Sequence, residues 1–134
     1  MAYFLAGGAK THGWKPAEGL VLANQALELN PRDPALNWTL GIKALSEFFL
    51  GDYDAAERDA RRALEVRYGY LFGRVILVAT LVEAGRLELA RAELGKILDL
   101  DPEFTSTRLV AYIFEDPQFR SRLLDGLRAA GLES

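Results

Sequence analysis

The chain has no cysteine and only one histidine among its 134 residues. Without cysteine there is no disulfide framework and no thiolate to act as nucleophile or metal ligand. The histidine, His12, lies between Thr11 and Gly13, whereas a metal site needs three or four ligands. We therefore expect His12 to be a surface residue, and we expect no metal, no cofactor and no catalytic residue in this chain.

A long apolar run is also missing. No segment approaches the roughly 20 consecutive apolar residues that a membrane-spanning helix needs. The first six residues, Met1–Ala6, are too short for a signal peptide and carry no basic leader. We therefore expect a cytoplasmic protein with no membrane partner.

Positive charge is not in excess, since 16 Lys and Arg face 19 Asp and Glu for a net charge of -3. Domains that bind nucleic acid usually carry clustered basic residues and a high isoelectric point. The densest basic stretch holds Arg58, Arg61 and Arg62, but Glu57 and Asp59 alternate with them. Glu57 and Arg61 form an (i, i+4) pair, which is typical of a solvated helix face. The pattern therefore predicts no nucleic-acid partner.

A phosphate-binding loop is suggested only faintly, by the glycine-rich segment 7–11 that ends in Lys10-Thr11. The complete loop pattern needs a glycine at position 4, where this chain has Phe4, and it should follow a strand. We therefore expect no phosphate binding there.

What the chain does have is one pattern written twice, 34 residues apart. Gly51 and Gly85 begin the two copies, and the small residues Ala56 and Ala90 stand at equivalent places. The other equivalent pairs are 53/87, 60/94, 63/97, 64/98 and 66/100. A gap-free period of this length, with small residues where two helices cross, predicts a tetratricopeptide-type solenoid of antiparallel helix pairs.

The coarse pattern is helical throughout, so we predict a single all-α domain over 1–134. The expected helices span about 2–11, 16–29, 34–50, 54–67, 71–84, 87–99, 105–114 and 117–130. They form three repeats (about 1–33, 34–70 and 71–104) followed by a C-terminal helix pair over 105–132. Gly51, Gly85 and Gly131 should end helices, because a left-handed residue costs little only for glycine. Asp33 and Pro34 should cap and start a helix that is one turn longer than its equivalents.

Beyond the repeat, the end of the chain is the more specific feature. The segments Phe48–Tyr53, Phe114–Pro117 and Leu124–Leu132 resemble the tetratricopeptide region of bacterial class III adenylate/guanylate cyclases and of some winged-helix transcriptional regulators. The similarity covers about residues 26–132, and it departs from the usual pattern at Tyr68, where a proline is common, and at Ala129, where a lysine is common.

This resemblance implies a sensing, oligomerising or partner-binding module that lies C-terminal to another domain. Neither a cyclase domain nor a winged helix is present in the sequence, so the resemblance carries over no catalytic residue. The chain begins inside what would be the first helix of a repeat, and we expect it to be part of a longer protein.

The candidate binding residues form an apolar stripe on the first helices of two repeats. The stripe comprises Trp38, Ile42, Leu45, Phe49, Phe72, Val75 and Ala79. In tetratricopeptide folds the first helix of each unit lines the concave groove. Lys43 and Glu47 occupy positions that are usually apolar in the repeat, and they form an (i, i+4) pair.

Two interpretations of this stripe stay open at the level of sequence. It can be core, covered by the flanking helices or by the tail helix folding back. Alternatively, it can be an exposed groove that binds a peptide, the protein's missing domain or a second copy. The expected function is a non-catalytic protein–protein interaction module in either case, and the alternative function is a homo-oligomerisation scaffold.

Overall fold

The fold is that of a computed structural model, described here for residues 15–105 and 117–132. Within these residues it contains six α-helices and no strand. The helices are α2 (Pro16–Leu29), α3 (Leu36–Leu50), α4 (Tyr53–Val66), α5 (Leu71–Glu83), α6 (Leu87–Leu100) and α8 (Pro117–Ala129). The all-α prediction is confirmed for this part of the chain. The expected helices 2–11 and 105–114 lie outside the described residues, apart from Thr105, which is not helical.

Glycine ends three of the helical segments as expected. Gly51, Gly85 and Gly131 have φ angles of 86°, 78° and 117°, in the region that residues with a side chain rarely adopt. After α3, the N–H of Gly51 donates to the carbonyl of Phe48 (3.1 Å) and the N–H of Asp52 donates to that of Glu47 (2.9 Å). These bonds satisfy carbonyls that the end of a helix would otherwise leave unpaired.

The start of α3 differs from the prediction. Pro34 and Ala35 lie in a turn, the helix begins at Leu36, and no side chain caps it. The carboxylate of Asp33 accepts instead from the N–H of Ala35 (2.7 Å), two residues on, as Asp commonly does in turns. The turn absorbs the extra residues, so α3 has 15 residues and is not a full turn longer than α5, the corresponding helix in the period, which has 13.

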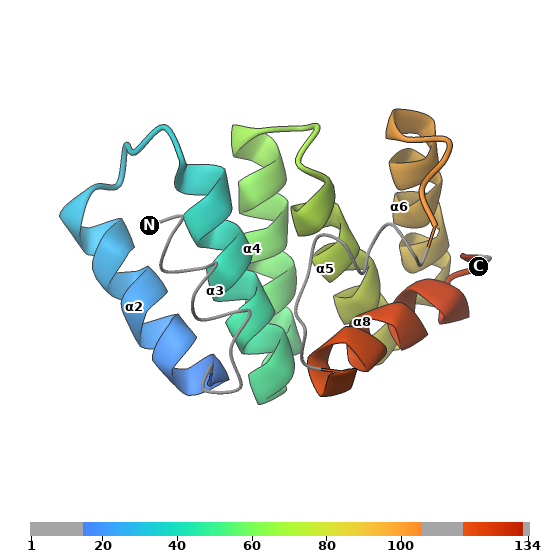
Figure 1. The fold of residues 1–134 in the computed structure, drawn as a ribbon, viewed down its shortest axis with the longest axis horizontal. Helices are drawn as coiled ribbons and strands as arrows, with labels where there is room; N and C mark the ends of the chain where they lie inside the picture. The colour runs from blue at the N-terminus through green and yellow to red at the C-terminus, as the bar shows by residue number, and fades with distance from the viewer. Residues whose placement is uncertain (1–14, 106–116, 133–134) are drawn as a thin grey trace.

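The helices α2 to α6 lie side by side in one row, and each runs antiparallel to the one before it (Figure 1). Each helix of the row contacts the next. The helices α3 and α5, which both pack against α4, also contact each other directly. The last helix, α8, crosses the row and packs against α5 (Figure 1). The helix α5 therefore lies at the centre of the packing, in contact with α3, α4, α6 and α8.

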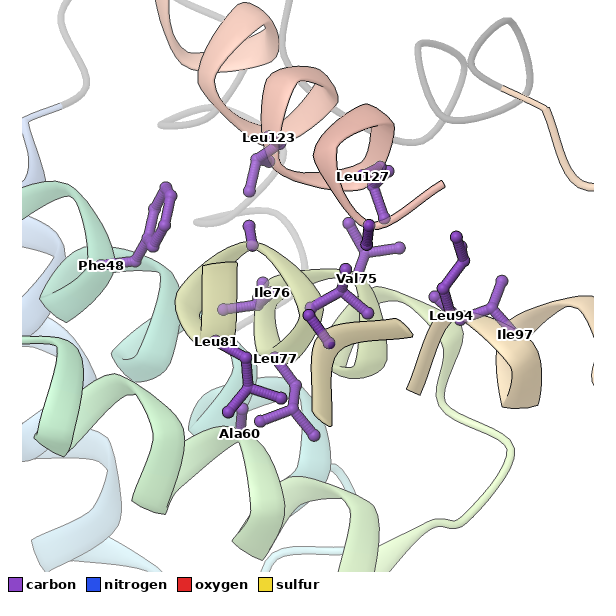
Figure 2. Packing of buried hydrophobic residues seen from close by; sticks show 14 of the residues in the cluster. Phe48, Ala60, Val75, Ile76, Leu77, Leu81, Leu94, Ile97, Leu123 and Leu127 are labelled. Atoms are coloured by element: carbon purple, nitrogen blue, oxygen red, sulfur yellow. The ribbon is translucent and has the colours of Figure 1, made fainter. Parts of the chain in front are cut away.

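The core is built around α5. Every residue from Gly73 to Leu81 is buried, as expected for a helix that is apolar on nearly all sides. Leu123 and Leu127 of α8 project toward α5 in Figure 2, and both are completely buried. The side of α4 that faces the core carries three small, fully buried residues, Ala56, Ala60 and Ala63. Their size lets the helices approach closely.

Candidate binding pocket between α3 and α5

A pocket of about 360 Å³ opens where the first halves of α3 and α5 meet the turn between α4 and α5. It is lined by Asn37, Trp38, Arg67, Gly69, Tyr70, Leu71, Phe72, Val75 and Phe104. This volume lies within the range of roughly 300–1,000 Å³ that is typical of sites for small ligands or for an anchoring side chain. Apolar walls with a few polar groups are the usual composition of such a site.

Tyr70 is the centre of the aromatic wall. Its ring centroid lies 6.4 Å from that of Trp38 and 6.3 Å from that of Phe72, the latter in an edge-to-face arrangement. Aromatic rings favour such offset and edge-to-face contacts, because the negative face of one ring meets the positive edge of the other. The three rings come from α3, from the residue before α5 and from α5, so the wall joins α3 and α5.

Two glycines make room for Tyr70. A Cβ added at Gly41 would lie 2.5 Å from the Tyr70 hydroxyl oxygen, and one added at Gly73 would lie 2.9 Å from ring atom Cδ2. Real Cβ atoms do not approach this closely, so any side chain at either position would displace the ring. Gly41 lies in α3 and Gly73 in α5, and both helices are thus shaped to hold the same tyrosine.

Two polar atoms at this wall are buried without a hydrogen bond to any described group. They are Nε1 of Trp38 and the hydroxyl oxygen of Tyr70. Burial raises the pKa of the Tyr70 hydroxyl, which therefore stays protonated and able to donate. Buried polar groups are usually paired, and an unpaired one costs about 1–3 kcal/mol. Their coincidence at one pocket makes this pocket the candidate functional site.

The remaining polar groups at the pocket are Asn37 and Arg67. Asn37 is buried, whereas Arg67 is exposed and makes no ion pair with any described carboxylate. Arg67 is also the one ionised side chain among the described residues that line this pocket. The pocket therefore offers apolar faces and one positive charge, with two covered donors in its wall and no acidic group.

Three of the predicted stripe residues, Trp38, Phe72 and Val75, meet in this pocket. The first two are partly exposed, and Val75 is buried. Two others lie elsewhere in the interior: Ile42 packs with Ala23 of α2, and Leu45 belongs to the main core. The structure thus divides the stripe between the pocket and the interior.

The last two stripe residues lie close to α8. A Cβ added at Gly126 of α8 would lie 2.8 Å from the Cα of Ala79, so the backbones of α8 and α5 are in direct contact there. Phe49 lies with its ring centroid 5.1 Å from the guanidinium carbon of Arg122, also on α8. At these two positions the tail helix folds back over the stripe, which is one of the arrangements that the sequence allows.

Sequence reasoning did not find Tyr70, Asn37, Arg67 or Phe104. Tyr70 stands in the turn before α5, outside the helical periodicity that revealed the stripe. The available signal was the pair of glycines inside otherwise apolar helices, at positions 41 and 73, because an interior glycine often marks a close approach by another group. Their joint contact with one ring depends on how α3 and α5 pack.

A second polar feature lies between α3 and α4, where Lys43 contacts two carboxylates. Its Nζ lies 2.6 Å from an oxygen of Asp59 and 3.1 Å from one of Glu47, which confirms the expected pair of Lys43 and Glu47. Arg62 and Arg58 bind Asp59 from the rim at 3.3 Å and 3.5 Å. Asp59 is completely buried, so its expected place on a solvated face is wrong. The expected pair of Glu57 and Arg61 is confirmed at 3.0 Å.

The surroundings of this cluster shift the pKa values of Glu47 and Asp59 in opposite directions. Burial, together with the neighbouring Asp59, raises the pKa of Glu47 to about 7. Burial also opposes ionisation of Asp59, but hydrogen bonds with Glu47 and Lys43 outweigh it and lower the pKa of Asp59. Asp59 is therefore the permanent counterion of Lys43, and Glu47 is the group that titrates near neutral pH.

Other chemistry is limited in the part of the chain that the structure describes. The expected surface residue His12 and the segment 7–11 lie outside it. Residues 15–105 and 117–132 hold no group of three or more His, Cys, Asp or Glu side chains placed to bind a metal ion. None of the described helices combines the length and the hydropathy that crossing a bilayer would require. A scan against models of known protein families finds no match, and a search of curated proteins finds none either.

Proposed function

We propose that the chain is a non-catalytic interaction module of the tetratricopeptide type, in which α3–α4 and α5–α6 are successive repeat units. The 34-residue period supports this proposal, as do the antiparallel order of the helices and the contact between α3 and α5. Ala56 and Ala90, which stand at equivalent places in the period, are both completely buried. Small buried residues at equivalent points are expected where the two helices of each unit cross.

In this proposal the binding site is the pocket between α3 and α5. The observation that carries it is the meeting of Trp38, Phe72 and Val75, which come from two successive units and line one pocket. Aromatic side chains supply a large contact area with few rotamers to order, and they dominate many protein–protein interfaces. A partner that anchors one side chain in this pocket would contact both units at once.

The resemblance of the chain's end to bacterial cyclase-associated and regulator-associated repeat regions supports a regulatory setting for the module. In that setting the partner is a neighbouring domain of the same protein or a separate signalling protein. This part of the proposal depends on sequence motifs alone.

Selection from a displayed library of random peptides tests the proposed function. We expect selected peptides to bind the wild-type chain and to lose about tenfold or more in affinity with Phe72→Ala, since aromatic anchors often contribute 2 kcal/mol or more. Leu89→Ala is the matched control, because Leu89 is also apolar and partly exposed but lies on α6, away from the pocket. Failure to select any peptide, or equal binding by Phe72→Ala, would overturn the proposal.

A stability measurement accompanies this test. Phe72 is partly exposed, so Phe72→Ala should cost about 1 kcal/mol of unfolding free energy. Phe48→Ala, at a completely buried position, should cost about 3–5 kcal/mol. A loss as large for Phe72→Ala as for Phe48→Ala would mean that Phe72 belongs to the core rather than to a binding surface.

Self-association is the second candidate function, and one observation favours it. The outer face of α2 exposes Val21, Leu22 and Leu29, with exposed fractions of 55%, 41% and 86%. Exposed apolar side chains gathered on one element often mark a site of association between proteins. Light scattering over a range of concentrations tests this candidate: a dimer that Leu22→Glu converts to a monomer supports it, and a strict monomer at high concentration excludes it.

A further inference from the structure

The inference here builds on the proposed function and concerns what the pocket recognises. We propose that the pocket between α3 and α5 binds an aromatic side chain of a partner peptide that has a carboxylate beside it. Trp38 and Tyr70 would provide hydrogen-bond donors, and Arg67 would provide the positive charge. Three properties of the pocket favour such a ligand: its shape, its unpaired donors and its charge.

The shape suits a single flat ring. Trp38, Tyr70 and Phe72 present ring faces and edges at centroid separations of 6.3 to 6.4 Å, and Val75 and Phe104 are buried apolar residues that also line the pocket. A fourth aromatic ring added to such a group gains the same offset and edge-to-face contacts that hold the wall together. An aliphatic side chain would gain only the burial of its apolar surface.

The two unpaired donor groups favour a ligand that carries a hydrogen-bond acceptor. Nε1 of Trp38 can only donate a hydrogen bond, and the hydroxyl of Tyr70 is kept protonated by its burial. Both lack a partner in the described structure, at a cost that a ligand oxygen would remove. Both atoms are themselves covered, so a ligand oxygen would reach them only after a shift of the Trp38 or Tyr70 side chain.

The charge favours an acidic ligand. Arg67 has no carboxylate partner within 4.0 Å among the described residues, and no acidic side chain lines the pocket. This contrasts with the basic residues of α4, where Arg58, Arg61 and Arg62 all pair with carboxylates. A carboxylate near the ligand's ring would pair with Arg67 and accept from the donors of the wall, and such charge-assisted hydrogen bonds are the stronger kind.

Nuclear magnetic resonance of the full chain tests the proposal with three acetylated and amidated tripeptides as probes. The side-chain N–H signal of Trp38 reports on the pocket, and it is distinguished from that of Trp14 by its loss in Trp38→Phe. We expect the glutamate–phenylalanine–glutamate peptide to shift this signal. The lysine–phenylalanine–lysine peptide should bind about tenfold more weakly, because Arg67 repels it. The glutamate–alanine–glutamate peptide should cause no shift.

Two conservative variants separate recognition from structure. Tyr70→Phe keeps the ring but removes the unpaired hydroxyl, so it should lower affinity for the first peptide about fivefold while leaving the melting temperature equal or higher. Arg67→Gln should lower affinity about tenfold and remove the preference for glutamate over lysine. Arg91→Gln on α6 is the matched control and should change neither quantity.

The outcomes also distinguish this inference from the proposed function. Equal binding of the lysine and glutamate peptides, or unchanged affinity with both Tyr70→Phe and Arg67→Gln, would overturn the ligand chemistry. If peptides selected from the library bound in a Phe72-dependent way but lacked an aromatic residue beside an acidic one, the proposed function would stand and this inference would fall. If no peptide of any kind shifted the Trp38 signal, both would fall.

Discussion

Asp59 and Glu93 stand at the same point of the 34-residue period, and each is a buried carboxylate held by a cation from the preceding helix. Asp59 of α4 binds Lys43 of α3 at 2.6 Å, and Glu93 of α6 binds Arg74 of α5 at 2.7 Å. Each carboxylate also has a basic residue three positions later, Arg62 at 3.3 Å and Lys96 at 2.8 Å.

The two ion pairs place a specific polar contact in an otherwise apolar crossing of helices. A buried charge is tolerated only when it is paired, so α4 can meet α3, and α6 can meet α5, only in registers that bring these residues together. The cations do not occupy equivalent positions. The residue 34 positions after Lys43 is Leu77, and the residue 34 positions before Arg74 is Leu40. The acidic residue therefore stands at the same point of both copies, whereas the cation of the second copy lies about one helical turn earlier than that of the first.

Removing Arg74 from its ion pair with Glu93 should lower the stability of the fold. Arg74 has 3% of its side chain exposed, and Arg74→Met would leave Glu93 with Lys96 alone. We expect a loss of about 3 kcal/mol in unfolding free energy, measured by chemical denaturation, because breaking a buried ion pair is strongly destabilising and Lys96, which is 47% exposed, compensates only in part. The control is Arg91→Met, which breaks an exposed pair with Glu88 and should cost less than about 1 kcal/mol. Equal losses would show that burial of the first pair does not matter.

Glu47 should make stability depend on pH near neutrality. Its folded-state pKa of about 7 lies above the ordinary value of 4.5, so between these values the folded chain holds a proton that the unfolded chain has released. The stability that Glu47 contributes is therefore complete below pH 4.5 and is lost as the pH rises through about 7. Asp59 acts with the opposite sign and in a lower range, because its pKa is lowered and its contribution is lost as the pH falls below its ordinary value of 3.8.

Glu47→Gln tests this pH dependence. The groups that face Glu47 are Lys43 on α3 and Asp59 and Arg58 on α4, and none of them titrates between about pH 5 and pH 7. Denaturation at several pH values should show a decline in wild-type stability over this interval that is absent in the variant. Glu88→Gln, at an exposed position, should keep the wild-type decline. An identical slope for Glu47→Gln would contradict the assignment.

The contact between α8 and α5 predicts opposite effects for two glycine substitutions. Gly126→Ala would place a methyl group 2.8 Å from the Cα of Ala79, and a backbone cannot move aside as a side chain can, so we expect a loss of about 1–3 kcal/mol. Gly95→Ala in α6 meets open space and should stabilise the chain by about 0.5–1 kcal/mol through higher helix propensity. Thermal melts of both variants check the pair, and two changes of the same sign would show that α8 does not pack closely on α5.

Ala90 tests the register of the repeat. Ala90→Trp would overfill a completely buried position at the start of α6 and should lower the unfolding free energy by about 1–3 kcal/mol or more. Ala92→Trp places the same side chain two residues further on, at an exposed position, and should have little effect. Similar melting curves for the two variants would count against the assigned register.

Local sequence determined most of the helical elements. Glycines 51, 85 and 131 end helical segments because their conformation depends on a single residue, and the bounds of α2 to α6 follow the periodicity of apolar side chains within one or two residues. The start of α3 was the exception. An Asp before a Pro can either cap a helix or stabilise a turn, and the local sequence around Asp33 is compatible with both. The pair of Lys43 and Glu47 was also predictable, since residues four apart on a helix are neighbours.

Tertiary structure decided which members of each pattern are buried and which are available. Asp59 belongs to a run of alternating charges but shares the buried face of α4 with Ala60, and Lys43 on the facing helix supplies the cation that its burial requires. Likewise, Ala79 and Trp38 share one apolar stripe, but α8 packs directly on Ala79 whereas Trp38 reaches the pocket. The pocket itself depends on Tyr70 lying against Gly41, which is distant in the sequence. Periodicity specifies which face of a helix is apolar, whereas what covers that face is set by the packing of segments far apart in the chain.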